Sequence, residues 1–199
     1  MMPSKPEKTD ISCVILAGGE GRRFNREDKG LVLLDGKPLI EHVIQQVSSQ
    51  VDDIVISANR NIDVYRKYTD RVIEDIDRGF NGPLAGIASC ISACDHEWIL
   101  VLPCDIPVLP ADLVEILHEI DNNKLIIAKA GERRQLVFLM HRSLTGKLND
   151  YLAQGHQKAM AWVELQNPAV VEFICESGEF VNINTPDKLT ALKDEPNKD

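Results

Sequence analysis

Glycines and basic residues gather directly after the first apolar run of the chain. Segment 16–24 reads L-A-G-G-E-G-R-R-F, and D-K-G follows at 28–30. Glycines let the backbone turn tightly and aim successive N–H groups at one point, which forms a nest for an anion. Arg22, Arg23 and Lys29 add positive charge there, and triphosphate is a natural ligand for that combination. The alternative is a plain glycine turn with solvated arginines.

The glycine loop departs from two common nucleotide motifs. The chain contains no G-x-x-x-x-G-K-[ST], so the loop is not a Walker A sequence. Gly19-Glu20-Gly21 is followed by Phe24 where a G-x-G-x-x-G motif needs its third glycine. The missing third glycine argues against a nicotinamide dinucleotide.

An acidic residue follows another apolar run, in P-C-D-I-P at 103–107. Asp105 can hold Mg²⁺ through one carboxylate, because this ion commonly takes one or two carboxylates with substrate phosphates and water. Asp is also frequent in turns, so Asp105 between two prolines has a structural alternative. Because we expect Asp105 to lie opposite a phosphate-binding loop, we favour the metal-binding role over the turn.

Two further segments carry polar residues that suit a ligand. Asp75 precedes G-P-L-A-G at 82–86 and can accept hydrogen bonds from a base or a ribose; the alternative is a surface carboxylate before a loop. Asn182 and Asn184 alternate in N-I-N-T-P, so they point the same way from an extended segment. They can face a polar ligand, or they can simply precede a helix capped by Thr185.

Apolar runs alternate with helical patterns along the chain, and these elements must position the polar segments. The patterns predict strands at 12–16, 53–57, 71–74, 98–102, 125–129, 136–140 and 170–175, and helices at 38–47, 84–94, 110–120, 143–154 and 185–192. Apolar strands separated by amphipathic helices indicate a mostly parallel sheet covered on both faces, a three-layer α/β fold. Ligands of such sheets bind at the carboxyl ends of strands.

Composition excludes several classes of protein. The 199 residues suit one domain at 10–192 with charged, flexible tails at 1–9 and 193–199. The formal charge of −9, without a long basic run, argues against nucleic-acid or membrane partners. Five scattered cysteines give no disulfide or zinc pattern, and segment 1–10 carries no export signal, so we expect a cytoplasmic protein.

The motifs together resemble the molybdenum cofactor guanylyltransferase family. The resemblance covers about residues 12–192 and rests on L-A-G-G with Arg23 and D-K-G, G-K-P-L at 36–39, G-P-L-A-G, P-C-D-I-P and N-I-N-T-P, in that order. The first motif alone indicates the nucleotidyltransferase superfamily with its Rossmann-like fold. The other motifs make the resemblance specific.

The resemblance implies a Mg²⁺-dependent enzyme that transfers GMP from GTP to the terminal phosphate of molybdenum-molybdopterin and releases pyrophosphate. It assigns nucleotide contacts to Leu16, Ala17, Gly18, Gly19, Lys29, Ser57, Asp75 and Asp105, the metal to Asp105, catalysis to Arg23, Lys29 and Asp105, and substrate contacts to Asn182 and Asn184. Ser57 stands where relatives often carry Asn. Phe24-Asn25 replaces the usual Met-Gly, and Gln135-Leu136 departs from the usual His-Pro or Gln-Pro.

Guanine selection is expected at 16–18, because a cytidylyltransferase relative usually reads L-A-A-G there and this chain has Gly18 in place of the second alanine. We expect a monomer with transient contacts to other cofactor-biosynthesis proteins and acceptor molybdoenzymes. Two alternatives stay open: another nucleotidyltransferase, using CTP or a sugar phosphate, and a non-catalytic GTP or pterin carrier.

Overall fold

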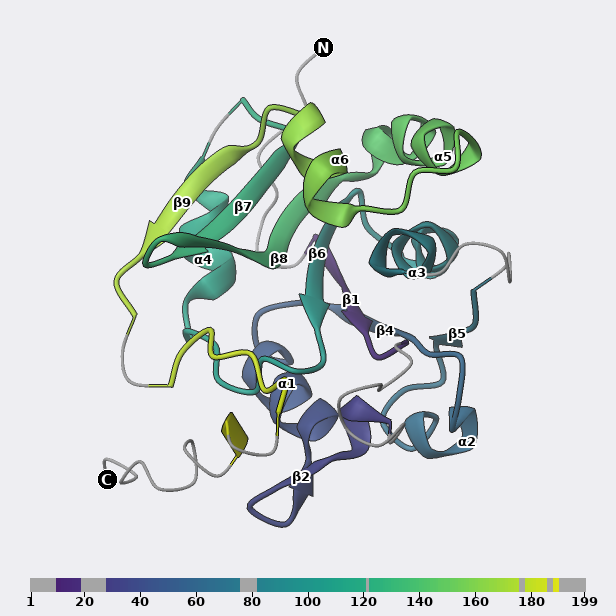
Figure 1. Ribbon diagram of the computed structural model, residues 1–199, viewed down its shortest axis with the longest axis vertical. Coiled ribbons are helices and arrows are strands. Elements are labelled where there is room, and N and C mark those ends of the chain that lie inside the picture. Colours follow the sequence, from purple (N-terminus) through teal and green to yellow (C-terminus); the bar gives the residue numbers. More distant parts are fainter. Residues whose placement is uncertain are drawn as a thin grey trace.

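A mostly parallel sheet of seven strands runs through the molecule, with helices on both faces (Figure 1). The computed structural model describes residues 10–18, 28–75, 82–120, 122–175, 178–185 and 188–189. The strands are β1 Ile11–Leu16, β2 Leu33–Leu34, β3 Lys37–Pro38, β4 Asp53–Ser57, β5 Val72–Ile73, β6 Trp98–Pro103, β7 Leu125–Ala130, β8 Arg133–His141 and β9 Ala169–Phe173. The α-helices are α1 Leu39–Val47, α2 Ile62–Tyr65, α3 Pro83–Cys90, α4 Leu113–His118, α5 Thr145–Ala153 and α6 Ala159–Leu165, and the short 3₁₀ helices are η1 Lys29–Leu31, η2 Ile91–Ala93 and η3 Arg142–Leu144.

The strand order of the sheet is β5-β4-β1-β6-β8-β7-β9. β1 is an inner strand that pairs in parallel with β4 and β6, whereas β8 runs antiparallel to its neighbours β6 and β7. The carboxyl ends of β5, β4, β1 and β6 therefore lie along one edge of the sheet. The predicted three-layer α/β, Rossmann-like architecture with a mostly parallel sheet is confirmed.

Two apolar cores explain the three layers. One core packs α1 and α4 against one face of the sheet, and the other packs α3, α5 and α6 against the opposite face. Neighbouring residues of β1 divide between them, because side chains alternate along a strand: Cys13 and Ile15 join the first core and Val14 joins the second. A strand buried on both faces is apolar along most of its length, which is the pattern at 13–16 and 98–102.

The predicted elements are found with shifted ends. Strand 53–57 is confirmed with its bounds, but the strand predicted at 71–74 is only Val72–Ile73 and helix 110–120 shortens to Leu113–His118. Helix 84–94 begins at Pro83 and gives way to η2 after Cys90. The sequence pattern did not predict α2, α6 or the β2–β3 hairpin. The predicted helix 185–192 lies mostly outside the described residues, and both predicted tails lie wholly outside them.

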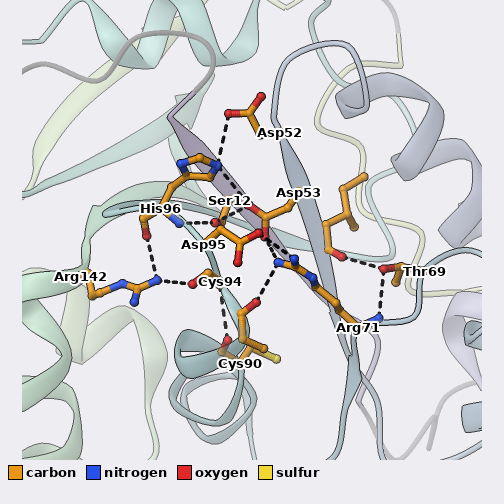
Figure 2. A network of polar contacts seen from close by, with 12 residues as sticks. Ser12, Asp52, Asp53, Thr69, Arg71, Cys90, Cys94, Asp95, His96 and Arg142 are labelled. Carbon is orange, nitrogen blue, oxygen red and sulfur yellow. Dashed lines mark hydrogen bonds and ion pairs between the residues drawn. The ribbon is translucent and has the colours of Figure 1, made fainter.

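A polar network lies at the amino ends of the strands, opposite the edge just described (Figure 2). Ser12 Oγ donates to Asp53 Oδ1 over 2.6 Å, and Arg71 donates to Asp53 Oδ2 over 3.1 Å. The His96 backbone N–H donates to Ser12 Oγ over 3.0 Å, and Arg142 donates to the His96 carbonyl over 2.9 Å. The network thus ties the starts of β1 and β4 to the segments that flank β5, β6 and β8.

Candidate active site

Backbone hydrogen bonds join the carboxyl ends of the central strands. The Ala17 N–H donates to the Ser57 carbonyl over 2.8 Å, and the Cys104 N–H donates to the Leu16 carbonyl over 3.1 Å. Gly18 lies two positions after the end of β1, and Asp105 lies two positions after the end of β6. The topology therefore brings the start of the glycine loop, Ser57 and the P-C-D-I-P segment to the same edge, because parallel strands end at one edge of a sheet.

Lys29 lies at the centre of a cluster of polar side chains from distant segments. Its ammonium donates to Asp105 Oδ2 and to Asn184 Oδ1, and it lies 3.5 Å from Asn182 Oδ1. The Asn182 side-chain amide in turn donates to Asp105 Oδ1 over 3.1 Å. The cluster unites the lysine of the glycine loop, the proposed metal carboxylate and both proposed substrate asparagines.

The backbone holds Asp105 and the asparagine segment together. The Ile183 N–H donates to the Asp105 carbonyl over 2.8 Å, and the Ile183 side chain is buried against Leu34 and Leu39. The Asn184 N–H donates to the Asn182 carbonyl over 3.1 Å, so the segment turns at Ile183, and both asparagine side chains lie at the Lys29 ammonium, where Asn182 also bonds Asp105. Among the described residues, the Asp105 carboxylate is bonded to distant side chains and not to its own turn, which disfavours the turn-cap interpretation.

Asp28 fixes the backbone that carries Lys29. Its carboxylate accepts from the Gly30 N–H over 3.3 Å, from Tyr65 Oη over 2.5 Å and from Asn61 Nδ2 over 3.0 Å. Burial, and next the hydrogen bond to Asp28, raise the pKa of Tyr65 well above its usual range, so the phenol stays a donor. A Cβ on Gly30 would lie 2.5 Å from Tyr65 Oη, which is why this position is glycine.

Asp75 follows β5 and is bonded to Asn59. Asn59 Nδ2 donates to Asp75 Oδ2 over 2.8 Å, and the Asp75 N–H donates to Asn59 Oδ1 over 2.9 Å. Burial raises the pKa of Asp75 more than the Asn59 hydrogen bond lowers it. Sequence reasoning missed Asn59, although its position two residues after Ser57 places both on the same side of an extended segment.

Ser57 and Gly18 complete this part of the edge. Ser57 is buried, and its hydroxyl lies where a Cβ on Gly86 of α3 would come within 2.4 Å. Gly18 is exposed, and a Cβ there would lie 3.3 Å from Asn59 Nδ2. Two predicted site residues, Gly19 and Arg23, lie outside the described residues.

The cluster around Lys29 suits Mg²⁺ in the chemistry of its donors. All three side chains that surround the ammonium present oxygen atoms, and oxygen is the donor that Mg²⁺ prefers. Within the described ranges, no group of three or more His, Cys, Asp or Glu side chains could hold a metal ion. A single carboxylate with substrate phosphates fits a Mg²⁺ nucleotide site better than an all-protein cage does.

Among the described helices, none has both the length and the apolar character required to cross a membrane.

Known proteins resemble this chain over most of its length. Residues 13–170 match the family model described as a MobA-like NTP transferase domain. The chain is 42% identical over 186 residues to a molybdenum cofactor guanylyltransferase of Shewanella amazonensis, covering 92% of this chain and 95% of that protein. It is 44% identical over 179 residues to the Yersinia pestis protein of the same name, covering 89% of this chain and 92% of that one.

A solved structure shows the same fold. The molybdopterin-guanine dinucleotide biosynthesis protein A of Archaeoglobus fulgidus superposes with a TM-score of 0.73 at 27% identity, over 92% of this chain and 96% of that one. The chain therefore belongs to the MobA-like nucleotidyltransferases, and within them to the molybdenum cofactor guanylyltransferase family.

Proposed function

We propose that this protein transfers GMP from GTP to the terminal phosphate of molybdenum-molybdopterin, forming the guanine dinucleotide cofactor and releasing pyrophosphate. An oxygen of the acceptor phosphate forms the new bond to the α-phosphorus, and the bond from that phosphorus to the bridging oxygen of the β-phosphate breaks. The observation that carries the proposal is the meeting of Lys29, Asp105, Asn182 and Asn184. It joins a phosphate-binding lysine to residues suited to a metal and to a second substrate.

The reaction places modest demands on acid–base chemistry. A phosphate monoester is already a nucleophile near neutral pH, so the protein works by in-line positioning and by neutralising charge. In this proposal Lys29 exchanges its contacts in the cluster for the phosphates of GTP and stabilises the leaving pyrophosphate. Arg23 and the Gly18 and Gly19 amides assist there.

Asp105 and the Asn182 amide are the groups that would hold Mg²⁺. When bound, this ion supplies Lewis-acid neutralisation of the phosphate charge. Asn182 also orients Asp105 through its 3.1 Å hydrogen bond, so it has a positioning role.

Base and acceptor occupy different parts of the edge. We assign the guanine to the side of Leu16, Ala17, Gly18, Ser57 and Asp75, where β1, β4 and β5 end. The acceptor phosphate belongs to the side of Asn182 and Asn184, beyond β6. Lys29 and Asp105 lie between them, where the transfer takes place.

Calorimetry with GTP, CTP and ATP, each with and without Mg²⁺, tests the proposal. We expect a Mg²⁺-dependent preference for GTP, followed by release of pyrophosphate when molybdenum-molybdopterin is added. A preference for CTP would assign the protein to the cytidylyl relatives, and GTP binding without turnover would indicate a carrier. Absence of nucleotide binding would contradict the phosphate-loop assignment.

A further inference from the structure

Asn59 and Asp75 form a closed pair of hydrogen bonds between two segments of the sheet edge. One bond runs from the Asn59 side-chain amide to the Asp75 carboxylate over 2.8 Å, and the other from the Asp75 backbone N–H to the Asn59 side-chain oxygen over 2.9 Å. The pair therefore restrains both the backbone and the side chain of Asp75. We call it the Asn59–Asp75 clamp.

The clamp requires the chemistry of asparagine. An amide side chain offers a donor and an acceptor side by side, whereas an aspartate offers acceptors alone and an alanine offers neither. β5, which leads to Asp75, has two residues and is the outermost strand on its side of the sheet. Because so short a strand restrains the chain weakly beyond its end, the position of Asp75 depends on Asn59.

The clamp leaves one carboxylate oxygen of Asp75 for a ligand. Oδ2 is bonded to Asn59, while Oδ1 is buried and has no hydrogen-bond partner among the described residues. A buried acceptor without a donor is costly, so a ligand that brings an N–H group is favoured there. The pairing edge of guanine carries two neighbouring donors, N1–H and the exocyclic amino group.

Gly18 sets how close the clamp lies to β1. A Cβ at this position would lie 3.3 Å from Asn59 Nδ2 and 3.8 Å from the Ser57 carbonyl oxygen. The absence of a side chain lets the Asn59 amide approach the end of β1, where the nucleotide loop begins. The clamp and Gly18, the last described residue after β1, therefore lie side by side at one site.

We propose that Asn59 is a positioning residue that fixes the Asp75 carboxylate so that Asp75 Oδ1 recognises the guanine base of GTP. The inference rests on the proposed function, and it adds a selectivity determinant outside the glycine loop. Asn59 acts through Asp75 and takes no part in the phosphate chemistry.

Because this role depends on an ionised Asp75 carboxylate, it affects how GTP binding varies with pH. The Asn59 hydrogen bond lowers the pKa of Asp75 against the larger effect of burial. The Cys90 thiol on α3 interacts electrostatically with Asp75: burial, then Cys94 and then the Asp75 charge raise the pKa of Cys90. Loss of Asn59 therefore raises the pKa of Asp75. As the pH is lowered, GTP affinity should begin to fall at a higher pH in the variant than in the parent protein.

The test compares Asn59→Ala and Asn59→Asp with a matched control, Asn123→Ala. Asn123 makes the same two kinds of bond, donating to the Asn167 carbonyl over 3.2 Å and accepting from the Leu125 N–H over 3.0 Å, at the start of β7. Calorimetry measures GTP and CTP binding across a pH series, and a turnover assay separates KM from kcat. Circular dichroism melting verifies that each variant is folded.

For Asn59→Ala we expect the Kd for GTP to rise about ten-fold, with kcat changed less than about three-fold and CTP binding unchanged. Asn59→Asp, which adds a negative charge beside Asp75, should raise the Kd further, to about 100-fold, and shift the acid limb more. Asn123→Ala should leave nucleotide preference and pH profile as in the parent protein.

Two results would overturn the inference, and they are distinguishable. If the parent protein prefers GTP and the folded Asn59→Ala variant keeps that preference and the acid limb, Asn59 has no positioning role while the proposed function stands. If the parent protein itself shows no preference for GTP, the proposed function fails and the inference fails with it.

Discussion

Among single residues, we expect substitution of Lys29 to have the largest effect on turnover, because its ammonium contacts Asp105, Asn182 and Asn184. We expect Lys29→Ala and Asp105→Asn each to lower kcat about 10²–10³-fold, as loss of one preorganised charge contact does in other enzymes. Pyrophosphate release measures the effect, and melting curves should show folded variants. The control is Lys37→Ala, since Lys37 is half exposed on β3 and its ion-pair distance to Glu41 is 4.0 Å. Turnover that survives either substitution would remove that residue from the mechanism.

Asp75 gives a prediction about stability as well as binding. Its pKa is raised by burial, so the folded state binds a proton more readily than the unfolded state. The charged carboxylate therefore costs stability above its folded pKa, and this cost disappears as the pH falls to the ordinary pKa of a free Asp. Asp75→Asn should raise the melting temperature at neutral pH and weaken GTP binding, and the thermal gain should vanish in acid. A melting temperature raised equally at both pH values would contradict this account.

At the scale of elements, α3 lies close against β4 because Gly86 has no side chain. A Cβ there would lie 2.4 Å from Ser57 Oγ and 3.3 Å from Leu16 Cδ2. We expect Gly86→Ala to lower the free energy of unfolding by about 1–3 kcal/mol, as overpacking does. Chemical denaturation measures this loss, and part of it should be recovered in the Gly86→Ala/Ser57→Ala double variant. Gly146 in α5 meets nothing within 4 Å, so Gly146→Ala is the control and should not destabilise.

The polar network in Figure 2 lies at the opposite edge of the sheet from the candidate site, so we expect changes there to affect stability and not GTP binding. Asp53 accepts from Ser12 and from Arg71, and its side chain is 11% exposed. Asp53→Ala should lower the free energy of unfolding by about 2 kcal/mol, because the buried Ser12 hydroxyl loses its acceptor and the half-exposed Arg71 loses an ion pair. GTP affinity should be unchanged. Asp63, 95% exposed in its ion pair with Arg66, is the control and should cost less than about 1 kcal/mol. A loss of GTP affinity in Asp53→Ala with an intact fold would show that the two edges are coupled.

The whole molecule should be stabilised by its ligands. The candidate site joins segments from residue 16 to residue 184, so a nucleotide that binds there favours the folded chain alone. GTP at about 100 times its Kd should add about 2.7 kcal/mol to the free energy of unfolding. Thermal melting with GTP and Mg²⁺ measures the gain, and a chelator should reduce it. An equal gain in Asp105→Asn would argue that this carboxylate does not hold the metal.

The sequence by itself determined which segments form the sheet and which of them end in chemistry. Segments 13–16, 54–56 and 98–102 are apolar throughout because both of their faces are covered, and that pattern is local. The glycine loop, Asp75 and Asp105 could be placed at strand ends for the same reason. Short elements escaped prediction: α2 has four residues, and α6 has seven in a largely apolar segment without a clear helical period.

The tertiary structure alone decided which of these residues meet. Lys29 and Asn184 are 155 positions apart, and no local preference of the chain indicates that their side chains touch. The strand order brings Asp105 beside the end of β1, and the bond from the Ile183 N–H brings the asparagines to Asp105. Asn59 was overlooked because its partner, Asp75, lies across a pairing of β4 with β5 that the sequence does not specify. Apolar periodicity is a property of neighbouring residues, whereas a site depends on how strands are ordered, and that order is set by packing of the whole chain.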